Sequence, residues 1–143
     1  MVREIVKDTE KLSEKCKTVT PKQKAELTEL ILDMRDTAAY YEDKMGCVGL
    51  AANQVGSDLR VILAKVRSGW IDMVNPVITR HSKGVIESEE GCLSLEGMRT
   101  VKRWDAVEVI YRDHNDRSHK QAFTGFEACI VQHEIDHLNG KLI

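Results

Sequence analysis

The strongest constraint on this chain is the run Gln132-His133-Glu134-Ile135-Asp136-His137 near its C-terminus. In an α-helix, His133 and His137 lie one turn apart on the same face, about 6 Å apart along the axis. Two imidazoles at this spacing can bind one metal ion, and Glu134 can act beside it as a general base. The alternative is a solvated helix whose two histidines happen to lie four residues apart.

The flanking sequence favours a buried helix. Thr124-Gly125-Phe126-Glu127 is typical of a capping box that begins a helix, and Gly140 can end it. The residues expected near one side of this helix include both histidines: Phe126, Ile130, His133, His137 and Leu138. We therefore expect the histidine pair to face the interior, which supports the metal-binding interpretation.

Length and composition predict one soluble domain, residues 1–143, that buries about two-thirds of its unfolded surface. The net charge of −2 gives no electrostatic case for binding nucleic acid or an anionic membrane. No apolar run is long enough to span a bilayer, and the first eight residues have no apolar signal core. The four cysteines form no Cys-x-x-Cys pair, which favours free thiols in a reducing compartment. We expect a cytoplasmic protein.

A long helix is predicted near the N-terminus, after a polar lead-in over residues 1–19 that can hold a short helical turn. Thr20-Pro21-Lys22-Gln23 combines a Thr cap, a Pro at the first helical position and a Gln three residues on. Gly46 can end this helix. Its apolar residues recur at three- and four-residue steps and predict a core-packing stripe: Leu27, Leu30, Ile31, Met34, Ala38, Tyr41 and Met45.

Several short strands are predicted between the two helices. The patterns favour strands at 59–64, 70–74 and 84–89, and a hairpin that pairs 107–112 with 120–123. The order is helix, strands, helix. This order predicts an α+β fold with an antiparallel or mixed sheet packed against a C-terminal metal-binding helix, and with a long N-terminal helix.

A metal site of this kind needs a third protein ligand and one position open for water. Only six residues follow His137, and the last of them is Ile143, so the ligand must come from upstream. The candidates are the remaining histidines and the cysteines: His81, His114, His119, Cys16, Cys47, Cys92 and Cys129.

Cys92 is the best of these candidates. Cys129 precedes His133 by four residues on the same helix, about 12 Å along the axis from His137, which is too far to share one ion. His114 and His119 flank a polar turn and are expected to be solvated. Cys92 has an apolar neighbour after it and a Gly before it, which allows close approach of the backbone.

Three segments together resemble the motifs of peptide deformylase, in the same order and at fitting spacing. They are Gly49-Leu50-Ala51-Ala52-Asn53-Gln54, Glu90-Gly91-Cys92-Leu93-Ser94 and Gln132-His133-Glu134-Ile135-Asp136-His137. The family removes the formyl group from the N-terminal formyl-methionine of nascent polypeptides. The resemblance therefore implies a metal-dependent hydrolase of N-terminal methionine processing in protein biosynthesis.

Carried over by position, the resemblance implies that Cys92, His133 and His137 bind one divalent metal ion. Fe²⁺ is the expected ion, and Zn²⁺, Ni²⁺ or Co²⁺ can replace it in the purified protein. The metal would lower the pKa of its bound water, and Glu134 would accept the proton and deliver it to the leaving amine.

The resemblance also assigns residues to transition-state and substrate binding. Gln54 and the backbone N–H of Leu93 would stabilise the tetrahedral intermediate. Ile130 and His133 would lie beside the pocket for the methionine side chain. The residues implied to hold the peptide in extended form are Val48, Gly49 and Gly91.

Two departures from the family pattern have expected consequences. Cys47 stands where the family usually has Gly, and it would cost about 1 kcal/mol if that position needs a positive φ. Glu96 stands where Pro is common, and this exchange would loosen the segment after Cys92. The chain also stops at Ile143, as the shorter members of the family do.

The implied partners are formyl-methionyl nascent peptides and the ribosome near its exit tunnel. Two other functions remain as alternatives. One is a catalytically silent metal-binding relative that holds nascent chains or ribosomal partners, which the presence of Glu134 and Gln54 disfavours. The other is a general zinc peptidase.

Overall fold

Three α-helices and seven strands make up the computed structural model, which describes residues 1–143. The helices are α1 (Thr9–Leu12), α2 (Lys24–Met45) and α3 (Gly125–Leu138), with the 3-10 turns η1 (Pro21–Gln23) and η2 (Ala52–Val55). The strands are β1 (Gly49–Ala51), β2 (Val61–Val66), β3 (Gly69–His81), β4 (Val85–Glu90), β5 (Arg99–Trp104), β6 (Ala106–Arg112) and β7 (Ser118–Thr124). No helix combines the length and apolar character that crossing a membrane requires.

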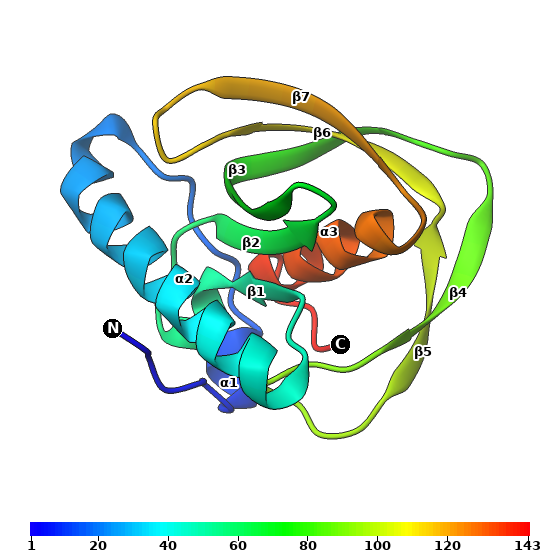
Figure 1. Cartoon of the computed structure of the whole chain (residues 1–143), viewed down its shortest axis with the longest axis horizontal. Helices are drawn as coiled ribbons and strands as arrows, with labels where there is room; N and C mark the ends of the chain where they lie inside the picture. Colours follow the sequence, from blue (N-terminus) through cyan, green and yellow to red (C-terminus); the bar gives the residue numbers. More distant parts are fainter.

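The strands form two antiparallel sheets. One has five strands in the order β1-β2-β3-β6-β7, and the other is the two-stranded β4–β5 ribbon. Figure 1 shows α3 in the middle of the molecule, with the strands of the larger sheet on one side and the ribbon across one end. The α+β class, the long N-terminal helix and the C-terminal helix packed on the sheet are confirmed.

Strands β1 and β2 are buried on both faces, between α2 and α3 (Figure 1). Successive residues of a strand point to opposite faces. In β2 the even-numbered Ile62, Ala64 and Val66 belong to the apolar cluster around α3, while Val61 and Leu63 belong to the cluster around α2. This double burial explains why the sequence of β2 is a continuous apolar run rather than an alternating one.

Helix α2 ends where the sequence indicates, but its predicted first turn at Pro21 is the 3-10 turn η1, and α2 itself begins at Lys24. The capping box between Thr20 and Gln23 is present, and Gly46 ends the helix with a left-handed φ of 71°. The buried stripe is centred on Leu30, Ile31, Met34 and Ala38. Met45 was wrongly predicted as part of it: its side chain is 69% exposed, because the last turn runs past β1 and β2 to the mouth of a cavity.

Strand β3 is longer than the predicted strand at 70–74, because it continues to His81. Pro76 lacks an N–H, Asn75 has a φ of 52°, and the pairing with β6 shifts register between Val74 and Val77. A Pro inside a strand normally argues against continuation, and a bulge is the way to accommodate it. Strands β1 and β5 were not predicted, whereas the predicted hairpin corresponds to β6 and β7.

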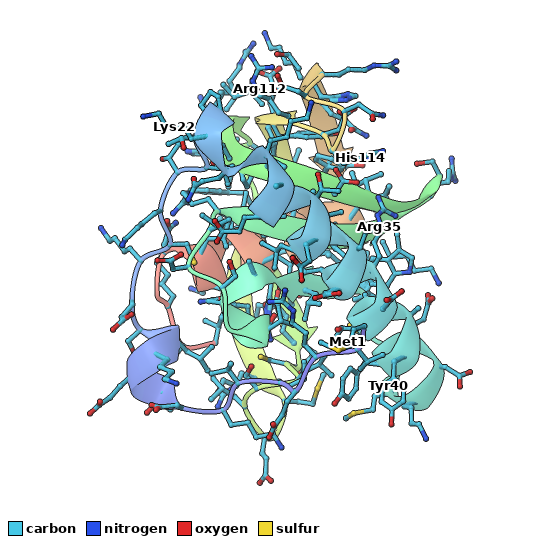
Figure 2. The ribbon with its side chains drawn as sticks, turned by 90° about the vertical axis from the view of Figure 1, so that its left-hand side faces the viewer. Met1, Lys22, Arg35, Tyr40, Arg112 and His114 are labelled. Atoms are coloured by element: carbon cyan, nitrogen blue, oxygen red, sulfur yellow. The ribbon has the colours of Figure 1, made fainter.

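A buried carboxylate joins α2 to the sheet and to the β6–β7 turn. Asp72 of β3 is 3% exposed and accepts hydrogen bonds from the backbone N–H of His114 at 2.6 Å and from its ring Nδ1 at 2.8 Å. The guanidinium of Arg35 on α2 forms an ion pair with the same carboxylate. Figure 2 shows Arg35 and His114 on one side of the molecule. Two elements that are distant in sequence, α2 and the β6–β7 turn, therefore share one acceptor on β3.

We expect Asp72→Ala to lower the free energy of unfolding by about 2–3 kcal/mol, because it leaves buried donors without their acceptor. The matched control is Asp58→Ala, which removes an exposed carboxylate 3.5 Å from Lys17 and should change stability by less than about 1 kcal/mol. Urea unfolding followed by circular dichroism measures both changes. Equal losses in the two variants would contradict a structural role for Asp72.

Candidate active site

Three side chains from two distant segments bring their metal-binding atoms together. Sγ of Cys92, which follows β4, lies 3.5 Å from Nε2 of His137, and Nε2 of His137 lies 3.1 Å from Nε2 of His133. All three atoms lie within 4.8 Å of one another. Both histidines come from α3, one turn apart as the motif predicts, and both are buried. The other candidate ligands named from the sequence are not part of this group.

The group fits a four-coordinate metal ion. Ligand bonds of about 2.0–2.3 Å at tetrahedral angles separate neighbouring nitrogen and sulfur ligands by roughly 3.3–3.6 Å. The observed N–N and S–N separations of 3.1 and 3.5 Å lie close to these values. The thiol and imidazole donor set suits Zn²⁺ and Fe²⁺ rather than Mg²⁺ or Ca²⁺. Cys92 and His133 also line the cavity described below, so an ion held by the three residues would be accessible from it.

A charged network fixes the orientation of His133. Its Nδ1 donates to the Glu90 carboxylate at 2.7 Å, so that its Nε2 points toward His137. Arg103 of β5 holds Glu90 with two hydrogen bonds, at 2.9 Å from Nε and 2.7 Å from Nη2, and also pairs with Asp136. Burial by itself raises the pKa of the Glu90 carboxyl, but the hydrogen bonds from Arg103 and His133 outweigh it and lower the pKa to about 2.

The two imidazoles are strongly coupled. Burial lowers the pKa of His133, but its hydrogen bonds with Cys92 and Glu90 outweigh burial and raise the pKa to about 10. At His137, burial and the neighbouring His133 lower the pKa to about 3. When the pair takes up an additional proton, these directions favour His133 over His137 as its site. Because ligating imidazoles are neutral, a bound cation takes the place of that proton.

Gln54 lies on η2 with its side chain 2% exposed. Its Oε1 accepts the N–H of Ala51 at 2.9 Å, which fixes the amide and directs Nε2 toward the cysteine. Nε2 lies 3.4 Å from Sγ of Cys92 and 3.2 Å from Oγ of Ser94. An amide donor next to a metal ligand is well placed to stabilise negative charge that develops there.

Glu134 is 5% exposed and its Oε1 has no hydrogen-bond partner. Burial raises the pKa of its carboxyl to about 7, in the range that suits a general base at neutral pH. Gly49 of β1 packs directly against it: a Cβ at position 49 would lie 2.5 Å from Oε2 of Glu134. Glycine at this position is therefore a condition for the observed placement of the carboxylate.

The site opens onto a cavity of about 760 Å³. Nine of the ten residues named from the sequence line it: Val48, Gly49, Gln54, Gly91, Cys92, Leu93, Ile130, His133 and Glu134. His137 lies behind them and is 1% exposed. A cavity of this size with an apolar wall and a few convergent polar groups is typical of a small-ligand or peptide site.

Two sequence expectations change at this cavity. Phe126 was expected on the interior side of the last helix, but it is 64% exposed at the cavity mouth, because it lies in the first turn of α3 beyond the sheet. Cys47 was expected to cost stability if its position needed a positive φ. The non-glycine residues with positive φ are Asn75 and Asp116 only, so this cost does not arise. The Cys47 thiol donates to the Gly49 carbonyl at 3.2 Å, and burial raises its pKa to about 11.

Sequence reasoning missed the residues that support the site. Glu90 and Ser94 lie in the same short segment as Cys92, and Arg103 lies on a strand that was not predicted. Two features of the sequence could have indicated them. Glu90 is a charged residue two positions before the candidate ligand Cys92, and Arg103 is a charged residue inside a short strand-like segment. Only the fold brings these charges together.

The whole chain is similar in sequence to proteins of one known family. Residues 2–143 match the family model described as Polypeptide deformylase. The peptide deformylase of Clostridium beijerinckii is 40% identical over 143 residues, which are 100% of both chains. The peptide deformylase of Dictyoglomus thermophilum is 35% identical over 144 residues, 100% of this chain and 91% of the relative.

Solved structures agree over nearly the whole chain. The peptide deformylase of Thermotoga maritima has a TM-score of 0.90 and 31% identity, covering 99% of this chain and 95% of its own. The class I type b peptide deformylase of Acinetobacter baumannii, with Met-Ala-Ser bound, has a TM-score of 0.89 and 33% identity, covering 99% and 97%.

We expect Arg103→Met to lower the free energy of unfolding by about 3 kcal/mol, because Glu90 and Asp136 lose their common buried cation. The control is Arg112→Met, whose ion pair with Asp116 is largely exposed and should matter by less than about 1 kcal/mol. Urea unfolding compares the two. A loss at Arg103 no larger than that at Arg112 would show that the network contributes nothing to folding.

Proposed function

Because this chain belongs to the polypeptide deformylase family and is an enzyme of that family, we propose that it removes the N-terminal formyl group from formyl-methionyl nascent peptides. Residues 1–143 form its catalytic domain. One observation carries the proposal: the metal-binding atoms of Cys92, His133 and His137 lie within 4.8 Å of one another, and Glu134 and Gln54 line the same cavity as Cys92 and His133.

Cys92, His133 and His137 hold one divalent metal ion in this proposal, and we assign Fe²⁺ as the native ion. When bound, the ion acts as a Lewis acid and supplies the nucleophilic water with a lowered pKa. The neutral imidazoles and the thiolate reach their positions through protein contacts. Glu90 orients His133, and the N–H of Ser94 donates to Sγ of Cys92 at 3.3 Å.

Glu134 moves the proton. Its carboxylate accepts a proton from the water as the new C–O bond forms at the formyl carbon. It then delivers this proton to the methionine nitrogen as the C–N bond breaks, releasing formate and a free amine. Its raised pKa supports both roles near neutral pH.

Gln54 and Leu93 stabilise the negative charge on the formyl oxygen in the tetrahedral transition state. Nε2 of Gln54 and the backbone N–H of Leu93 are the donors, and each is worth about 3 kcal/mol by comparison with other oxyanion sites. The Gln54 amide is already fixed by Ala51, so little reorganisation is needed when the charge develops.

The substrate lies in the 760 Å³ cavity. Ile130 and His133 line the pocket for the methionine side chain, and the backbone at Val48, Gly49 and Gly91 holds the peptide in extended form. The Acinetobacter baumannii relative has been solved with Met-Ala-Ser bound, which supports a peptide that begins with Met as the ligand of this chain. The substrates occur on nascent chains in the cytoplasm, near the exit of the ribosome.

The test is formate release from formyl-Met-Ala-Ser, measured under anaerobic conditions with protein whose metal content is determined by elemental analysis. Unformylated Met-Ala-Ser and casein are the controls. Formate release without cleavage of the controls supports the proposal, and iron as the bound metal supports its Fe²⁺ assignment. Metal-loaded protein without formate release would favour the silent relative, and cleavage of casein would favour the zinc peptidase.

We expect Glu134→Gln to keep its metal and to lose kcat by a factor of about 10² or more, because the amide cannot accept the proton. Elemental analysis and the formate assay measure the two quantities on the same sample. Near-normal kcat in a metal-loaded variant would contradict the assigned role of Glu134.

We expect Cys92→Ala to lower the metal content of the protein as well as its activity, because it removes one of three ligand atoms. Cys129→Ala is the matched control, since Cys129 lines the same cavity but its sulfur is not in the ligand group. Metal content after dialysis distinguishes them. Unchanged metal content in Cys92→Ala would mean that another residue is the third ligand.

A further inference from the structure

One buried side chain near the site has no place in the proposed reaction. Asn53 precedes Gln54 on η2 and is 7% exposed. Its Nδ2 donates to the backbone carbonyl of His137 at 2.7 Å, across 84 residues of sequence. The contact therefore joins the turn that carries the proposed oxyanion donor to the helix that carries the imidazoles.

The carbonyl that Asn53 contacts belongs to the last turn of α3. Carbonyls at the end of a helix have no partner four residues on and need one from elsewhere. The His137 carbonyl also accepts the N–H of Gly140 at 3.0 Å, and Asn53 is the only side chain that donates to it. The next carbonyl, of Leu138, is held by Arg60 and by the N–H of Cys16. Two different anchors thus hold two successive residues.

A second observation concerns the side chains of the same two residues. Oδ1 of Asn53 and Nδ1 of His137 are both buried and both lack a partner. One is an acceptor, and the other carries the proton when Nε2 of a neutral His137 faces a metal. A metal-binding histidine normally donates its second ring N–H to an oxygen, which fixes the ring and raises the basicity of the ligating nitrogen. Glu90 does this for His133, and no carboxylate does it for His137.

We propose that Asn53 is the positioning residue of His137: its Nδ2 fixes the main chain, as observed, and its Oδ1, which makes no hydrogen bond in this structure, accepts the ring Nδ1–H when the ring binds a metal. The nitrogen and the oxygen of the Asn53 amide then both bind His137. Because Gln54 is the next residue, η2 sets the position of His137 and of the oxyanion donor together. This inference rests on the metal site of the proposed function and adds a residue to it.

The main test uses cobalt-loaded protein and does not depend on formate release. We expect Asn53→Ala to release Co²⁺ to a chelator about 10- to 100-fold faster and to shift the visible Co²⁺ absorption bands, as loss of an outer partner of a metal ligand does. In the formate assay kcat should fall while KM stays within about twofold, because no substrate contact is lost.

The matched control is Arg60→Met, which removes an anchor of the same helix end without touching His137. It should leave Co²⁺ release and absorption close to those of the unmodified protein. A similar change in both variants, or no change in Asn53→Ala, would reduce Asn53 to a general helix anchor and overturn the proposal.

A measurement on the unmodified chain covers the case in which Asn53→Ala does not fold. In the Zn²⁺-loaded protein, the Nδ1–H of His137 should give a low-field proton signal that exchanges slowly and shows a through-space contact to the Asn53 amide protons. Absence of that contact would overturn the proposal. Unmodified protein that binds Co²⁺ but releases no formate would contradict the proposed function instead.

Discussion

The buried guanidinium of Arg103 connects the β4–β5 ribbon to α3, and the rest of the candidate site depends on this connection. The ribbon supplies Glu90 and leads directly into Cys92, whereas α3 supplies both imidazoles. Apolar packing alone would not fix the distance between a two-stranded ribbon and a helix to the tenths of an ångström that metal ligation needs. Charge-assisted hydrogen bonds to Glu90 and Asp136 are directional, and burial strengthens them.

The two faces of β1 and β2 pack against different parts of the molecule. The face toward α2 is covered by an apolar cluster that carries no chemistry, with Leu30, Met34 and Leu63 among its members. The face toward α3 belongs to a second apolar cluster, which includes Ile130, Val131 and Ile135 of α3, and the same helix carries His133, Glu134 and His137 of the site. A rigid apolar layer behind a polar site limits the movement of the strands that carry it, and so preserves the geometry that the polar groups need.

The sequence predicted the elements whose signals are local. The Thr20–Gln23 capping box and Gly46 defined the long helix, and the sequence pattern defined the β6–β7 hairpin. Helix α3 begins after Thr124 as predicted, but the capping box with Glu127 does not form, because the Glu127 carboxylate accepts the N–H of Arg67 instead. The strands it missed depend on tertiary contacts: β1 has only three residues, and β3 continues past Pro76 because a bulge lets β6 pair on the far side. In the site, the four-residue spacing of His133 and His137 predicted a pair of metal ligands. Cys92 was chosen as the third ligand by comparing the candidates and by the family resemblance. The roles of Arg103, Ser94 and Asn53 could not be predicted, because each has a partner 33 or more residues away in the sequence.

The small residues of β1 and η2 explain how a helix with a polar inner face can pack in the middle of the molecule. Ala51 and Ala52 are fully buried, and Gly49 leaves no room for a Cβ beside Glu134. Small side chains let the backbone of this segment approach α3 closely, and the Asn53 side chain in the same segment donates to the His137 carbonyl. Cys47 is tolerated two residues earlier because its thiol bonds the Gly49 carbonyl instead of entering the space that Glu134 occupies. Position 47 therefore accommodates a side chain, whereas position 49, two residues later, does not, because the carboxylate of Glu134 occupies the space beside it.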